Sequence, residues 1–199
     1  SNVELFARQI RKFKPALVAL FDETKIDILK ELVADLDVEI VSGPEGLVYV
    51  ASFSEADLVV SGVVGSAGLV PALEALRAGK NLALANKETL VIAGKLMLKE
   101  AELTNTKIIP IDSEHSAVFQ ALNGEKTEQI NKIILTASGG PFRTFSLKQM
   151  ENITVSQALN HPNWSMGAKI TIDSSTMMNK GLEYIEAKWL FGVNTDVEI

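Results

Sequence analysis

Apolar runs alternate with amphipathic segments along the first 122 residues, and this alternation limits the possible folds more than any other feature. The apolar runs are nearly continuous, which is typical of strands buried on both faces of a sheet. Helices are predicted at residues 3–14, 26–36, 69–78, 88–103 and 113–122, and strands at residues 16–21, 38–41, 58–64, 81–85 and 107–111. This order predicts an α/β fold with a Rossmann-like parallel sheet covered by helices.

The organisation changes after about residue 125. The sequence predicts a strand at residues 132–136, a loop-rich segment at 137–166, a strand at 169–172 and a helix at 176–191. A long irregular segment in a compact protein is typically a functional lid. We therefore expect an incomplete Rossmann-like domain at residues 1–112 and an α+β domain with a lid loop at residues 113–199. A new strand-like run stands at the end of the sequence, so we expect the second domain to be truncated.

Composition narrows the function classes. The chain has 199 residues, of which 47% are hydrophobic and 22% charged, so it is large enough to bury a core. The net charge of −6 and the lack of a basic run argue against a nucleic-acid partner. No apolar run is long enough to span a membrane. The absence of cysteine excludes disulfides and thiolate-bound zinc.

Two carboxylates flank a serine where the last strand of the first domain gives way to a helix. Residues 111–116 read IDSEHS, which places Asp112 and Glu114 two positions apart around Ser113. Strand residues two apart project to one face, so both side chains are candidates for one Mg²⁺ or Mn²⁺ site. The alternative is helix capping by Asp112 with Glu114 complementing the helix dipole. For this motif alone, capping is the favoured interpretation.

A second polar group lies on the last predicted helix. Ser174, Asn179 and Lys180 offer hydroxyl, amide and ammonium donors that suit a phosphate. Glu183 lies three and four positions after Lys180 and Asn179, on the same helix face, and is a candidate third metal ligand. The alternative is a solvated pair between Lys180 and Glu183, which spacing alone favours.

A glycine-rich turn follows the strand at residues 58–64. Residues 62–68 read GVVGSAG, and they join a strand to a helix as phosphate-binding loops do. The spacing and the late position in the chain differ from the dinucleotide fingerprint. We therefore interpret the segment as a tight turn that lines a cofactor cleft.

Taken together, these motifs resemble one enzyme family. They are LANKETL at residues 84–90, IDSEHS at 111–116, LTASGGPFR at 135–143, HPNWSMG at 161–167 and SSTMMNKGLE at 174–183. In this set and order they resemble the signatures of the 1-deoxy-D-xylulose 5-phosphate reductoisomerase family. The resemblance covers almost the whole chain and favours a ligand site over the capping and salt-bridge alternatives.

The resemblance implies an enzyme that depends on NADPH and on Mg²⁺, Mn²⁺ or Co²⁺ and that makes 2-C-methyl-D-erythritol 4-phosphate for isoprenoid synthesis. Its domains would be an NADPH-binding one at residues 1–112 and a catalytic one at residues 113–199. Metal ligands correspond to Asp112, Glu114 and Glu183, and the catalytic set adds Lys87 and His161. Phosphate and other substrate contacts correspond to Ser138, Ser174, Asn179, Lys180, Lys87, Ser113, His161, Glu114 and Glu183. Cofactor contacts correspond to Asn86, Glu88 and Gly167, with Trp164 and Met166 on the lid and His115 as helix scaffold.

The chain departs from the family in length. Family members begin with a strand and a glycine-rich loop for the NADPH pyrophosphate and finish with a helical domain, and neither is found in these residues. We therefore expect a parent enzyme that is a homodimer in the bacterial cytoplasm or a plastid-type organelle, with this chain an inactive fragment. Two alternatives are a metal- and phosphate-binding core without catalysis and another NAD(P)-dependent oxidoreductase of similar fold.

Overall fold

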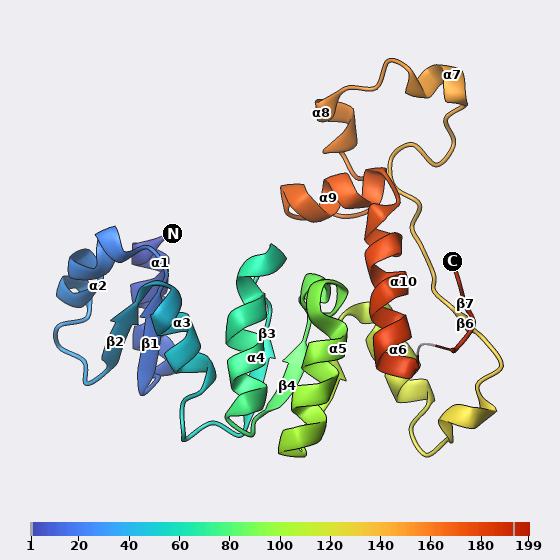
Figure 1. Ribbon diagram of the computed structural model, residues 1–199. Coiled ribbons are helices and arrows are strands. Elements are labelled where there is room, and N and C mark those ends of the chain that lie inside the picture. Colours follow the sequence, from blue (N-terminus) through green and yellow to red (C-terminus); the bar gives the residue numbers. More distant parts are fainter. Residues whose placement is uncertain (1, 193) are drawn as a thin grey trace.

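The computed structural model describes residues 2–192 and 194–199, and it begins with a small α/β unit. Strand β1 (Leu17–Leu20) pairs in parallel with β2 (Glu39–Ser42), and helices α1 (Val3–Phe13) and α2 (Ile26–Leu32) pack together beside them. Apolar residues at helical spacing on α1 and at alternate positions on β1 meet in one core with side chains of α2. Figure 1 shows this unit in blue.

The central unit is a three-stranded parallel sheet in the order β3-β4-β5. Its strands are β3 (Leu58–Ser61), β4 (Asn81–Leu84) and β5 (Ile108–Pro110). Its helices are α3 (Gly43–Ala51), α4 (Leu69–Arg77) and α5 (Lys87–Thr104), which pack in sequence from α3 to α5. Leu82 and Leu84 of β4 are fully buried in a core with side chains of α4 and α5, and Ala83 between them, on the other face, is buried too, as expected for a strand covered on both faces. The α/β fold with parallel strands is therefore confirmed.

Helix α10 (Met178–Phe191) joins the C-terminal part to the central unit by packing along α5. The two helices pack closely at Gly94, where an added Cβ would lie 2.4 Å from the Trp189 ring. The other face of α10 packs against β6 (Ile133–Ile134) and β7 (Val197–Glu198), which pair in parallel. Helix α6 (Ser113–Ala121) follows β5 directly. This packing brings the ends of α5, α6 and α10 together (Figure 1).

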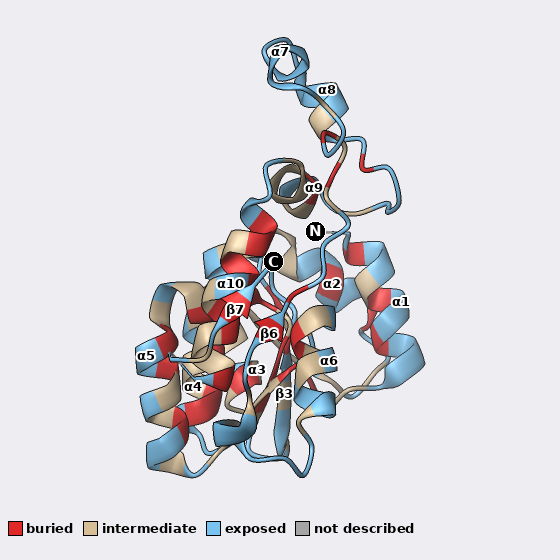
Figure 2. Cartoon of the chain, turned by 90° about the vertical axis from the view of Figure 1, so that its right-hand side faces the viewer, coloured by how far each residue is buried: buried red, intermediate tan, exposed pale blue. Residues whose placement is uncertain are grey.

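The segment between β6 and α9 (Ala168–Ser175) projects from the rest of the molecule. It contains two short helices, α7 (Leu147–Met150) and α8 (Val155–Ala158), and Figure 2 shows that most of their residues are exposed. Each helix begins with a capping box, formed by Ser146 with Gln149 and by Thr154 with Gln157. Single 3₁₀ turns complete the described elements: η1 (Glu23–Lys25), η2 (Gly65–Gly68) and η3 (Thr127–Gln129).

One predicted strand is wrong. Residues 169–172 belong to helix α9, although Ile170, Thr171 and Ile172 have high β propensity. The Thr171 hydroxyl donates to the Gly167 carbonyl at 2.8 Å, and α9 packs against α8 and α10. Tertiary packing therefore outweighs local propensity here.

The alternation of helices and strands in the sequence predicts one parallel sheet, but the described strands form three separate sheets. Backbone hydrogen bonds connect the described strands into one sheet of three and two sheets of two strands, and β1 does not pair with β3. Within residues 2–192 and 194–199, no helix has both the length and the apolar character needed to cross a membrane.

Candidate metal and phosphate site

Asp112 and Glu114 stand at the start of α6, directly after β5. The Asp112 carboxylate accepts a hydrogen bond from the Ser113 backbone N–H at 3.0 Å, so Asp112 does cap the helix. Glu114 lies in the first turn of α6 rather than on a strand. Strand alternation was therefore the wrong reason to bring the two carboxylates together, because the turn into the helix aims both of them.

Glu183 of α10 supplies the third carboxylate. One oxygen each of Asp112, Glu114 and Glu183 lies within 4.8 Å of the others. The Glu183 side chain is 2% exposed, and those of Asp112 and Glu114 are 17% and 23% exposed. The group is thus closed on the protein side and open on one side, as a cation that also binds a ligand requires.

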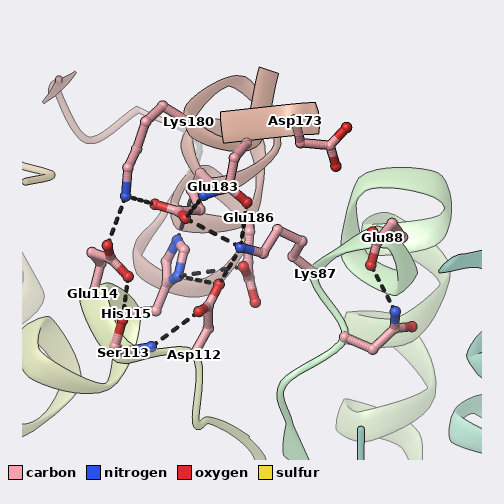
Figure 3. A network of polar contacts seen from close by, with 12 residues as sticks. Lys87, Glu88, Asp112, Ser113, Glu114, His115, Asp173, Lys180, Glu183 and Glu186 are labelled. Carbon is pink, nitrogen blue, oxygen red and sulfur yellow. Dashed lines mark hydrogen bonds and ion pairs between the residues drawn. The ribbon is translucent and has the colours of Figure 1, made fainter. Parts of the chain in front are cut away.

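Two lysines form ion pairs with these three carboxylates. Lys87 Nζ is 2.8 Å from Asp112 Oδ2 and 3.1 Å from Glu183 Oε1. Lys180 Nζ is 2.7 Å from Glu114 Oε1 and 2.5 Å from Glu183 Oε2. Figure 3 shows both ammonium groups pointing into the carboxylate cluster from opposite sides. The alternative of a solvated Lys180–Glu183 pair does not apply, because both side chains are buried.

The ionic contacts set the protonation of the site. Burial raises the pKa of Asp112, but the His115 hydrogen bond and the Lys87 ammonium lower it to about 2. Burial also raises the pKa of Glu114, and the hydrogen bond from Lys180 lowers it below its usual range. For Lys87, burial lowers the pKa and the neighbouring carboxylates raise it above its usual value. All three groups are therefore charged at neutral pH.

A cavity of about 530 Å³ opens beside the carboxylates. The sharp turn between α9 and α10, where Met177 has a φ of 62°, brings the ends of both helices to it. The turn before the lid lies close by, since a Cβ on Gly140 would be 2.5 Å from the Ser174 carbonyl oxygen. Four residues with phosphate-compatible donors line the cavity: Ser138, Ser174, Asn179 and Lys180. Lys87, Ser113, Trp164 and Met166 line it as well.

His161 lies behind the cavity rather than on its wall. Its Nδ1 accepts hydrogen bonds from the backbone N–H groups of Asn163 and Trp164, at 3.2 and 3.1 Å. In the neutral ring Nε2 then carries the proton, and Nε2 lies 3.1 Å from Ser138 Oγ. His161 can thus orient Ser138 and tie it to the base of the lid.

A second cavity, of about 420 Å³, adjoins the first and shares with it Lys87, Ile170 and Asn179. The residues expected near the cofactor, Asn86, Glu88 and Gly167, line this cavity together with Gly62, Val63 and Val64. The glycine-rich segment therefore lines the cleft as a turn.

Three residues near the site were missed from sequence or given no role. Lys169 pairs with Glu88 across the second cavity and with Asp173 at 2.7 Å. His115 and Glu186 are fully buried next to Asp112. The spacing of Glu186 three positions after Glu183 places both on one helix face, which is a signal that could have been used.

Comparisons with known proteins identify the family of this chain. The model of 1-deoxy-D-xylulose 5-phosphate reductoisomerase matches residues 1–94, and the model of its C-terminal domain matches residues 108–191. The reductoisomerase of Trichlorobacter lovleyi is 56% identical over 190 residues, which are 96% of this chain and 49% of the relative. That of Chloroherpeton thalassium is 55% identical over 98% of this chain and 51% of the relative.

Solved structures of reductoisomerases are also similar to this chain. A DOX-P reductoisomerase in complex with NADPH, fosmidomycin and magnesium has a TM-score of 0.89 and 45% identity, over 99% of this chain and 52% of that chain. The Zymomonas mobilis enzyme in complex with NADPH has a TM-score of 0.87 and 43% identity, over 96% of this chain and 48% of that chain. The chain thus spans about half the length of the relatives it matches. It belongs to the 1-deoxy-D-xylulose 5-phosphate reductoisomerase family.

Proposed function

We propose that this chain carries the metal, substrate and part of the cofactor site of an enzyme that converts 1-deoxy-D-xylulose 5-phosphate to 2-C-methyl-D-erythritol 4-phosphate with NADPH. One observation carries the proposal: three carboxylates from α6 and α10 converge beside a cavity lined with phosphate donors. The names of the relatives support the same reaction.

The metal ligands are Asp112, Glu114 and Glu183. Three oxygen donors with one open side suit Mg²⁺, Mn²⁺ or Co²⁺, and no nitrogen or sulfur ligand favours a softer ion. When bound, the cation acts as a Lewis acid on the substrate carbonyl, which promotes rearrangement of the carbon skeleton. Lys87 reaches the same point from α5 and donates to the oxygen atoms of the substrate.

The phosphate of the substrate binds to Ser138, Ser174, Asn179 and Lys180. Because Nε2–H of His161 donates to Ser138 Oγ, the Ser138 hydroxyl proton is free to donate into the cavity. His161 is in this view a positioning residue. Trp164 and Met166 close the open side of the cavity, which excludes water from the substrate.

The nicotinamide end of NADPH binds in the second cavity, against Asn86, Glu88 and Gly167. This cofactor supplies the hydride. Lys87 and Asn179 lie on the walls of both cavities, so they hold the substrate directly beside the cofactor.

The full-length parent is proposed to be a homodimer that acts on a small phosphosugar and not on nucleic acid, in keeping with the net charge of −6. The relatives are bacterial enzymes, which favours the bacterial cytoplasm over a plastid-type organelle.

The test is an assay of NADPH oxidation with 1-deoxy-D-xylulose 5-phosphate and Mn²⁺, in a full-length protein that contains these 199 residues. Asp112→Asn should remove most of the activity and weaken Mn²⁺ binding about tenfold or more. Glu198→Gln is a control, because Glu198 pairs with Lys132 on the surface. Absence of substrate-dependent oxidation in the unsubstituted protein would refute the proposal.

A further inference from the structure

Two buried ionisable side chains next to the metal site have no part in the proposed function. His115 and Glu186 are both fully buried, on α6 and α10 respectively. Nδ1 of His115 and both carboxylate oxygens of Glu186 are buried without a hydrogen-bond partner of good geometry. Nδ1 and Glu186 Oε2 nevertheless face each other at 3.3 Å. Unsatisfied buried polar atoms of this kind are rare and need a physical explanation.

The second ring nitrogen of His115, Nε2, determines which nitrogen faces the carboxylates. Nε2 of His115 is 2.8 Å from the backbone carbonyl oxygen of Glu183. Because a carbonyl only accepts, Nε2 must carry a proton and donate. The ring also stacks on Phe191 with an interplanar angle of 11°, which holds its plane. Nδ1 is therefore the atom that faces Asp112 and Glu186.

A hydrogen on Nδ1 pairs two of these three atoms, Nδ1 itself and Glu186 Oε2. Without it, a lone pair on Nδ1 would face two carboxylates, at 3.3 Å from Glu186 and 3.8 Å from Asp112 Oδ2. This contact joins α6 to α10 through Nδ1, while Nε2 binds the Glu183 carbonyl on the same helix α10.

We infer that His115 and Glu186 are positioning residues that set the spacing of the metal ligands without contacting the metal. His115 on α6 contacts two ligands at once, Asp112 through Nδ1 and Glu183 through its backbone carbonyl. Glu186 on α10 faces the same nitrogen, Nδ1, at 3.3 Å (Figure 3). The pair thereby fixes the start of α6 against α10. This role rests on one part of the proposed function, the binding of a cation to Asp112, Glu114 and Glu183.

The test is calorimetric titration of the chain with Mn²⁺. Glu186→Leu removes the partner of Nδ1 and should weaken Mn²⁺ binding about tenfold or more, as supporting residues of metal ligands typically do. His115→Gln keeps an N–H donor for the Glu183 carbonyl but has no equivalent of Nδ1, so it should weaken binding similarly. Glu186→Gln keeps an acceptor for Nδ1–H and should bind within about threefold of the original chain.

A double variant and a stability control separate positioning from general damage. Because the two residues act as one unit, His115→Gln with Glu186→Leu should bind no more weakly than the weaker single variant. Val33→Ala removes a buried side chain from the core of α1, α2 and β1. It should lower the melting temperature and leave Mn²⁺ affinity unchanged.

The outcomes distinguish the two proposals. If the original chain does not bind Mn²⁺, or if Asp112→Asn binds it equally well, the proposed metal site is wrong. If Asp112→Asn weakens binding but Glu186→Leu and His115→Gln do not, the site stands and the positioning role is refuted. Should Glu186→Leu fail to fold, His115→Gln decides the question in the same way.

Discussion

Lys180 occupies a position between Glu114 and Glu183 that a divalent cation would share. We expect a bound cation to compete with this ammonium group and to leave the lysine free to turn toward a phosphate in the cavity. Metal and phosphate binding would then be coupled through one side chain, and each should strengthen the other. The short distances of 2.5 and 2.7 Å show that the ion pairs are fully formed.

This competition predicts opposite effects of Lys180→Met on the two ligands. Removal of the ammonium group should tighten Mn²⁺ binding several-fold, to on the order of tenfold, because a competing positive charge is lost. Binding of inorganic phosphate in the presence of Mn²⁺ should weaken, since a donor is lost. Calorimetry measures both. Lys188→Met is the control, because Lys188 lies on the same helix and donates to the Thr195 carbonyl instead. Weaker Mn²⁺ binding in Lys180→Met would contradict the competition.

The packing of α5 on α10 positions the site, because Lys87 lies at the start of α5 and Glu183 lies on α10. The substitution Gly94→Ala tests this packing. The added methyl group would overlap the Trp189 ring, so we expect a loss of about 1 to 3 kcal/mol in unfolding free energy, reduced by alanine's better helix propensity. Gly181→Ala is the matched control, because its Cβ would meet only Met178 Sδ at 3.5 Å and should be neutral or stabilising. Equal melting temperatures for the two variants would contradict the close packing.

The lid segment makes a separate prediction. Trp164 lines the cavity but is 64% exposed, so closure over a ligand should change its fluorescence. A phosphonate hydroxamate with Mn²⁺ should shift the emission, and Trp164→Phe should abolish the shift while Trp189 continues to report the packed core. If calorimetry shows ligand binding and the emission does not change, Trp164 is not part of a closing lid.

The elements differ in how far sequence could predict them. The helices and strands of the first 122 residues followed from hydrophobic periodicity, because burial on a sheet face imposes it. Helices α7 and α8 were missed although Ser146 with Gln149 and Thr154 with Gln157 have the spacing of capping boxes. The convergence of Asp112 with Glu183, 71 positions apart, depends on the packing of α10 on α5. Spacing made Glu183 only a candidate ligand, and the resemblance to a family favoured it. The link from His115 to Glu186 had no such indication.

At the scale of the whole molecule, the residues of the proposed metal and phosphate site lie around one cavity, and the proposed cofactor residues line the cavity beside it. Strand β3 has an edge with no partner strand among the described residues, and Leu58 and Val60 on it are 49% and 67% exposed. The relatives are about twice as long as this chain. The sequence resemblance implies that the NADPH pyrophosphate binds to a strand and glycine-rich loop outside these residues. Those backbone amides and the helix that follows such a loop supply much of the binding energy for a pyrophosphate.

Residues 1–199 on their own should therefore bind Mn²⁺ and phosphate but show negligible NADPH oxidation with 1-deoxy-D-xylulose 5-phosphate. Hydride transfer requires the nicotinamide to be held against the substrate carbon, and a misplacement of about 1 Å already costs about a hundredfold in rate. Addition of the family's N-terminal segment should restore NADPH binding, which quenching of protein fluorescence by the cofactor measures. Activity should return only when the C-terminal domain is also present. Treatment with EDTA should abolish that activity, and Mn²⁺ should restore it. Substantial NADPH oxidation by residues 1–199 alone would show that the cavity beside Asn86 and Glu88 binds the whole cofactor without the pyrophosphate loop.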